Sequence, residues 1–189
     1  MGAEDSHAVI RAEMTRWLER FVVGLNLCPF ARQPLAAGLV RIQVTDAASE
    51  ESLLEALQEE LVRLDQTAPE NLETTLLVMD SMLQDFSRYN EFLYLANALL
   101  QDFGWEGQFQ IASFHPHYQF AGTGPGDAEN YTNRAPWPTL HLLREDRVEQ
   151  ALESHPDPEA IPDRNIRRMN RLGSQTLAQW LAQCRGECP

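Results

Sequence analysis

Apolar residues recur at intervals of three and four along several stretches of the chain, the spacing that places them on one face of an α-helix. In the first stretch, Trp17, Phe21 and Leu25 share a face in this way. The same periodicity, with Ser49 as a cap before one helix and Gly104 ending another, predicts five helices. They cover Ser6–Leu25, Ser49–Gln66, Asp85–Phe103, Asp146–Glu153 and Asp163–Cys184.

Four shorter runs have the pattern of β-strands. Leu39–Thr45 and Thr139–Arg144 alternate apolar and polar residues, whereas Thr74–Met79 is a compact run typical of a buried strand. Phe109–Phe114 is the remaining one. Strands that alternate with helices favour a single α/β domain over residues 1–189. We expect a four-stranded mixed or parallel sheet with helices packed on it, and a helix at each end of the chain.

The connection over residues 115–138 is long, rich in Gly and Pro, and has neither helical nor strand periodicity. Loops of this length inside compact domains tend to be functional, and disorder is the alternative interpretation. The aromatic residues Phe120, Tyr131 and Trp137 favour an ordered loop. We therefore treat this loop as a candidate part of a functional site.

Composition narrows the classes of function. The net charge of −13 disfavours binding to nucleic acid and to anionic membrane surfaces, because both are negatively charged. All fifteen basic residues are Arg, which excludes mechanisms that need a lysine amine, such as Schiff-base catalysis. No apolar run is long enough to span a membrane. The odd number of cysteines and the lack of an export signal predict a cytoplasmic protein with reduced thiols.

Reactive side chains follow the predicted strands. Ligands of open parallel sheets bind beyond the carboxyl ends of the strands, and Asp80 and His115 lie at such ends. If the chain stays extended, His115 and His117 project to the same side and can share a divalent transition metal, with Asp127 as one candidate third ligand. The alternative is that one imidazole makes a structural hydrogen bond and the other faces solvent.

Two further groups are candidates. Cys28 lies on an irregular segment and, paired with His115, would become a nucleophile; the alternative is a buried, unreactive thiol. In the loop, Asn130, Asn133 and Arg134 have amide and guanidinium groups that, with Asp80, can position a substrate. The alternative for this trio is that the side chains hold the loop together.

Four stretches of the chain have distinctive amino-acid sequences. They are Gly24–Phe30, Phe114–Thr123, Asn130–Pro136 and Thr139–Glu145. Over nearly its whole length the chain resembles the bacterial family called domain of unknown function 1415. The resemblance implies a cytoplasmic bacterial protein of this architecture. It implies no activity, substrate, cofactor or catalytic residue.

The sequence therefore supports two hypotheses of function. In the first, the protein is an enzyme that acts on a small polar or anionic metabolite, with His115 as acid/base or metal ligand, assisted by His117, and Cys28 as nucleophile or ligand. In the second, it is a module that binds a ligand or a protein without catalysis. Both expect a small-molecule or protein partner, no nucleic acid and no membrane, and leave the oligomeric state and any cofactor open.

Overall fold

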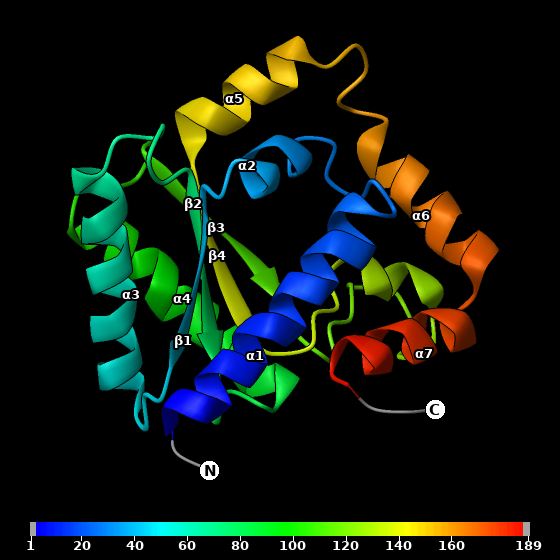
Figure 1. Ribbon diagram of the computed structural model, residues 1–189, viewed down its shortest axis with the longest axis horizontal. Helices are drawn as coiled ribbons and strands as arrows, with labels where there is room; N and C mark the ends of the chain where they lie inside the picture. Colours follow the sequence, from blue (N-terminus) through cyan, green and yellow to red (C-terminus); the bar gives the residue numbers. More distant parts are fainter. Residues whose placement is uncertain (1–2, 187–189) are drawn as a thin grey trace.

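The computed structural model describes residues 3–186 and contains one sheet of four strands in the order β1-β2-β4-β3 (Figure 1). The strands are β1 (Val40–Thr45), β2 (Thr74–Met79), β3 (Phe109–Phe114) and β4 (Thr139–Arg144). β1 and β2 are parallel, and β4 is antiparallel to both of its neighbours. The expected α/β fold with a mixed sheet is thus confirmed. β1, β2 and β3 all run in the same direction, so their carboxyl ends lie at one edge of the sheet.

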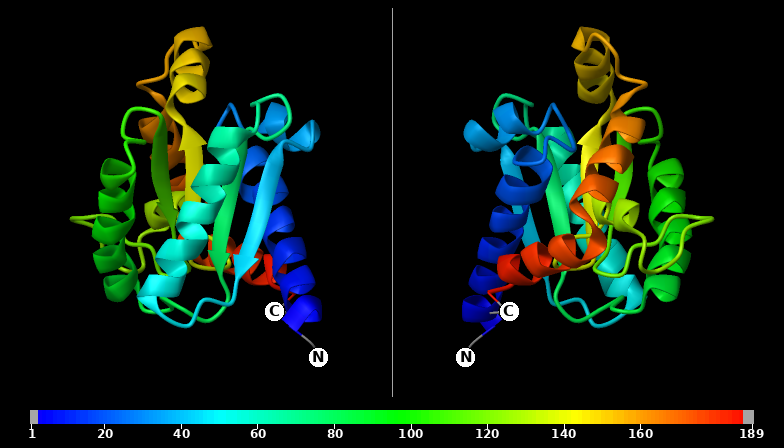
Figure 2. Two further views of the ribbon diagram at one scale, coloured as in Figure 1. Left: turned by 90° about the vertical axis from the view of Figure 1, so that its left-hand side faces the viewer. Right: turned by 90° about the vertical axis from the view of Figure 1, so that its right-hand side faces the viewer.

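Two helices cover one face of the sheet, as Figure 2 shows. They are α3 (Glu50–Gln66) and α4 (Phe86–Asp102). Leu57 and Phe92 of these helices are buried in one cluster with Leu77 of β2 and Leu140 of β4. Because side chains alternate along a strand, the strand residues next to Leu77 and Leu140 point to the opposite face of the sheet.

A second helical layer covers that opposite face. It consists of α1 (Ala3–Trp17), its π-helical continuation (Leu18–Val23), α6 (Ile161–Leu172) and α7 (Ser174–Cys184). Trp17, Phe21 and Met169 pack there with Leu76 and Val78 of β2. The molecule is therefore three layers deep, with the sheet in the middle (Figure 2).

The helical prediction needs three corrections. The expected helix Asp163–Cys184 is two helices, because Gly173 between them has φ 79° and ψ 148°. The first helix changes to π-helical hydrogen bonding after Trp17 and ends at Gly24. A short helix, α2 (Arg32–Ala36), was not predicted. The expected short helix after β4 is α5 (Glu145–Ser154).

The connection between β3 and β4 has one 3-10 helix, Ala128–Thr132, which contacts α6. Ala128 and Tyr131 are buried in the cluster of α1, α6 and α7, so the loop is anchored to the molecule. In the part of the chain that the structure describes, no helix has both the length and the apolar character needed to cross a membrane.

Candidate functional site

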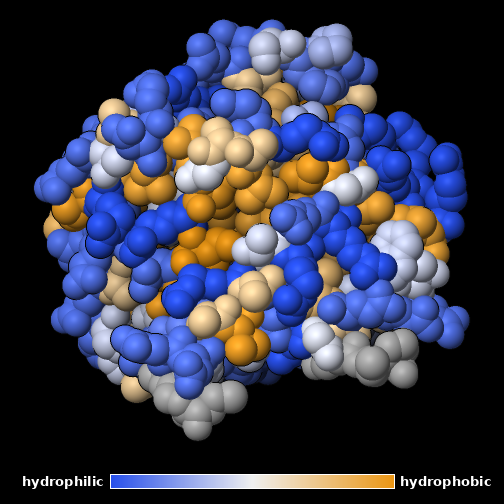
Figure 3. Space-filling view, in the orientation of Figure 1, coloured by the Kyte–Doolittle hydropathy of each residue, from blue (hydrophilic) through white to orange (hydrophobic). Residues whose placement is uncertain are grey.

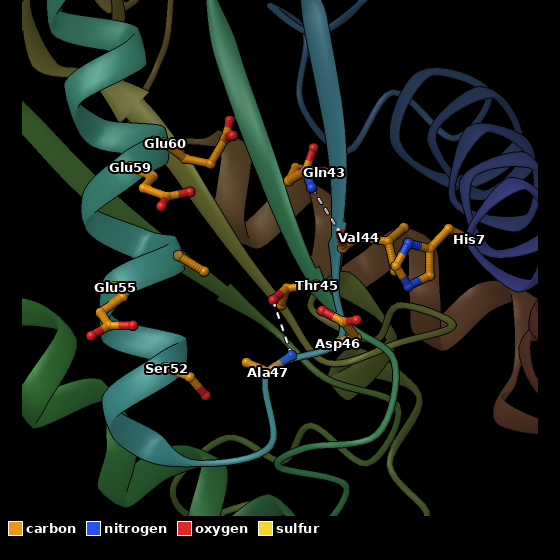
Figure 4. Close-up of a pocket in the computed structure, with 11 residues that line it drawn as sticks. His7, Gln43, Val44, Thr45, Asp46, Ala47, Ser52, Glu55, Glu59 and Glu60 are labelled. Atoms are coloured by element: carbon orange, nitrogen blue, oxygen red, sulfur yellow. Dashed lines mark hydrogen bonds between the residues drawn. The ribbon is translucent and has the colours of Figure 1, made fainter. Parts of the chain in front are cut away.

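A cleft of about 350 Å³ lies at the carboxyl end of β1, between α3 and the first turns of α1 (Figure 4). This volume is within the usual range for small-molecule sites, and the carboxyl end of a parallel strand is their usual place. The side chains and backbone that line it are His7, Gln43, Val44, Thr45, Asp46, Ala47, Ser52, Glu55, Ala56, Glu59 and Glu60. We call it the β1–α3 cleft.

The periodicities of strand and helix bring these residues together. Gln43 and Thr45 are two apart on β1 and therefore share the side that faces α3. Glu55 and Glu59 are four apart on α3 and therefore lie on one side of that helix. In Figure 4 the end of β1 lies between these glutamates and His7 on α1. The cleft thus extends across the outer edge of β1.

The cleft is negatively charged. The charge of Glu60 is neutralised, because Arg41 donates to its carboxylate at 2.8 Å and Arg63 at 3.3 Å. The Glu60 side chain is only 5% exposed. Within residues 3–186, Asp46, Glu55 and Glu59 form no ion pair. None of the lining residues is an Arg. The three carboxylates therefore make this cleft attractive to cations and unattractive to anions.

A histidine and an aspartate meet beside the cleft. Nε2 of His7 lies 3.8 Å from Oδ2 of Asp80, which directly follows β2. Among the described residues, Nε2 of His7 and Oδ1 of Asp80 are buried atoms that have no hydrogen-bond partner. Asp80 was expected to bind substrate, and the structure places it near the cleft, next to His7.

His115 is completely buried, and both of its ring nitrogens make hydrogen bonds to the backbone. Nε2 donates to the carbonyl of Leu83 at 3.0 Å, and Nδ1 accepts from the N–H of His117 at 3.0 Å. Burial lowers the pKa of His115 to about 4, so the ring is neutral near pH 7. His117, in contrast, is exposed. This geometry favours the structural interpretation of the pair.

The metal hypothesis gains no support from the geometry. No group of three or more His, Cys, Asp or Glu side chains within residues 3–186 is arranged to hold a metal ion. Asp127, the expected third ligand, is exposed and instead accepts a hydrogen bond from the N–H of Gly124 at 2.8 Å. His115 has no ring nitrogen left for a metal while its two backbone hydrogen bonds are in place.

Cys28 and His115 lie on opposite faces of the sheet. Cys28 follows Leu25 and Leu27, which are buried with α1 and α6, whereas the ring of His115 contacts Phe86 and Tyr89 at α4. Burial raises the pKa of the Cys28 thiol, although Arg164 nearby acts in the other direction. The structure thus does not bring the predicted nucleophile and base together, and their catalytic roles stay predictions.

The polar trio of the loop is bonded mainly to the loop itself. Oδ1 of Asn130 accepts from the N–H of Phe120 at 3.0 Å, and its Nδ2 donates to the carbonyl of Gly124 at 2.8 Å. Arg134 donates to the carbonyls of Tyr118 at 3.1 Å and Pro125 at 2.8 Å. Asn133 donates to the carbonyl of Ser113 at 3.1 Å. These contacts favour a structural role over substrate binding.

Sequence reasoning overlooked His7, Glu55 and Glu59 as site residues. The spacing of the two glutamates was visible, but it is also the spacing of an ordinary solvated helix face. Nothing local marks His7, because its place depends on how α1 packs across the sheet. Asp46 was recognisable as a residue that follows a strand, and it does line the cleft.

Comparison with known proteins gives one match. The family model described as "Protein of unknown function (DUF1415)" matches residues 9–179. No curated protein and no solved structure matches the chain. Because the family model spans most of the sequence, the chain belongs to the DUF1415 family.

Proposed function

We propose that this protein binds a small cationic ligand, one with an ammonium or guanidinium group, in the β1–α3 cleft. The observation that carries the proposal is the charge of the lining: Asp46, Glu55 and Glu59 have no ionic partner among the described residues, and no Arg lines the cleft. The ligand class differs from the anionic metabolite considered from the sequence. The proposal from the structure and the hypothesis from the sequence agree that the ligand is a polar small molecule.

The neutral groups of the cleft suit the same ligand. The Thr45 hydroxyl accepts from the N–H of Ala47 at 3.2 Å and has a second lone pair for a ligand N–H. Gln43 uses one N–H and one lone pair of its amide within the protein, because it donates to the carbonyl of Val44 and accepts from Arg41. A ligand is therefore held mainly by charge and by Thr45.

Agmatine, which has one ammonium and one guanidinium group, is a suitable probe. We expect it to bind in isothermal titration, and the double substitution Glu55→Gln and Glu59→Gln to weaken binding by about tenfold or more, since hydrogen bonds to charged groups contribute about 1.5–3 kcal/mol each. Glu149→Gln on α5 is the matched control and should leave the affinity unchanged. Equal affinity for all three proteins, or no binding to the wild type, would contradict the proposal.

A catalytic role is the second candidate, and the His7–Asp80 pair favours it. A histidine beside a carboxylate can transfer protons to a ligand that reaches it, and His7 lines the cleft. If the protein is an enzyme, a bound amine will be converted by the wild type and recovered unchanged from His7→Asn. Recovery of the intact ligand from both proteins would leave binding without catalysis.

A further inference from the structure

β1 is an edge strand, and part of its backbone is available for pairing. It pairs with β2 alone, and the carbonyl of Thr45 accepts from the N–H of Asp80. In a parallel ladder, alternate residues bond to one neighbour and those between them point the other way. The N–H and C=O groups of Val40, Ile42 and Val44 therefore point away from the sheet. Only the carbonyl of Val44 has a partner there among the described residues, the Gln43 amide at 2.9 Å.

The surface along this edge has an apolar part and an acidic part. Figure 3 views the molecule from the side where β1 is exposed, and apolar residues gather there over α2, the start of β1 and the adjoining part of α1. Leu35, Val40 and Ile42 are only partly buried. At the other end of the strand the β1–α3 cleft begins, with Asp46, Glu55 and Glu59.

Open edges of this kind normally have protection, since unpaired N–H and C=O groups template pairing with another chain. Charged side chains or a proline on the edge strand are the common means. β1 has no proline, and its one charged side chain, Arg41, is paired with Glu60. The backbone groups of Val40 and Ile42 at this edge are therefore available to an added strand.

We propose that the open edge of β1 binds an extended basic segment of a partner protein as a fifth strand, with a Lys or Arg side chain of that segment in the β1–α3 cleft. The inference rests on the proposed function, because it identifies the cation of the cleft as a side chain. Backbone pairing with Val40, Ile42 and the N–H of Val44 supplies affinity, since the carbonyl of Val44 already accepts from Gln43. The carboxylates select a cationic side chain at one end, and the apolar surface near Leu35 selects an apolar side chain at the other.

Charge favours this occupant over a second copy of the chain. Two copies paired through β1 would bring two molecules of net charge −13 together, with an acidic cleft on each side of the junction. Like charges at that separation repel, whereas a basic segment lowers the local charge. The edge and the cleft together therefore fit a cationic strand.

The test uses a blocked six-residue peptide of alternating valine and lysine, the length of β1. A second version has N-methyl groups on the amides of its pairing edge, which removes hydrogen-bond donors and keeps the charge. We expect the first peptide to bind with at least about tenfold higher affinity than the methylated one, and to slow amide exchange at Val40 and Ile42. A valine–glutamate peptide should not bind.

The lack of Lys in the chain makes the contact easy to map. Carbodiimide couples lysine amines to carboxylates, and the protein has no side-chain amine to compete. We expect the peptide to couple to Glu55, Glu59 or Asp46. Coupling should fall with Glu55→Gln and Glu59→Gln, be lost when Asp46→Asn is added, and be kept with Glu149→Gln.

The outcomes separate the two proposals. If agmatine binds in the cleft but N-methylation leaves peptide affinity unchanged, the strand inference fails and the proposed function stands. If neither agmatine nor the peptide binds, both fail. A stable dimer in sedimentation, lost with Ile42→Pro and kept with Ile42→Val, would show that a second copy occupies the edge and would overturn the inference.

Discussion

At the scale of single residues, His115 shows how a candidate catalytic group serves the fold. Its ring connects the turn at Leu83 to the backbone of His117 and packs against Phe86 and Tyr89. The sequence predicted that this histidine follows a strand, and that is correct. It could not show that both nitrogens are occupied, because one partner lies 32 residues away along the chain.

The protonation of His115 makes stability depend on pH. Its pKa is lowered to about 4 in the folded protein, whereas the ordinary value is about 6.5, so between these values the unfolded chain binds a proton that the fold excludes. Stability should therefore fall as the pH is lowered from about 6.5 towards about 4. His141 has the same sign, since burial lowers its pKa to about 4 as well.

The substitution His115→Gln isolates the contribution of His115. Near neutral pH it should lower the free energy of unfolding by about 1–3 kcal/mol, because buried hydrogen bonds are lost. In urea unfolding at a series of pH values, this deficit should shrink as the pH approaches about 4. A deficit that stays constant over that range would show that the histidine is not held neutral.

At the scale of elements, the predicted strands agree with the observed ones to within one residue. Alternation and apolar runs are local patterns in the sequence, and they were sufficient to predict the bounds of the strands. The break between α6 and α7 was missed because apolar residues such as Met169, Leu177 and Cys184 continue at helical spacing across it. The direction of β4 was also open, since it depends on the path of the preceding loop and not on the residues of the strand.

The break at Gly173 gives a direct prediction. With φ 79° and ψ 148°, this position is in a region that residues with a Cβ rarely adopt. Gly173→Ala should therefore destabilise the protein by about 1–3 kcal/mol in urea unfolding. Gly126→Ala is the control, because Gly126 has no positive φ and a Cβ there would meet nothing within 4 Å. Equal stability of both variants would contradict this explanation of the break.

At the scale of the whole molecule, net charge opposes compactness. Fifteen basic residues are distributed against twenty-eight acidic ones, and several of the acidic residues gather on α3. Such self-repulsion is screened by salt.

Unfolding midpoints should therefore rise modestly when NaCl is increased from about 20 mM to about 300 mM, where the Debye length falls to below about 8 Å. Urea unfolding at fixed pH measures this shift. A midpoint that falls with salt would show that the ion pairs of Glu60 and the other acidic groups outweigh the repulsion.

The position of β4 has a consequence for how the chain is made. Because β4 lies between β2 and β3, a ribosome that has synthesised only the first three strands holds a β1–β2 pair and a third strand without a neighbour. The apolar side of α4 then lacks Leu140 and Leu142, which it packs against in the finished molecule. Nascent chains stalled before residue 139 should consequently be prone to aggregation and sensitive to protease. The complete four-stranded sheet should form only once β4 has left the exit tunnel.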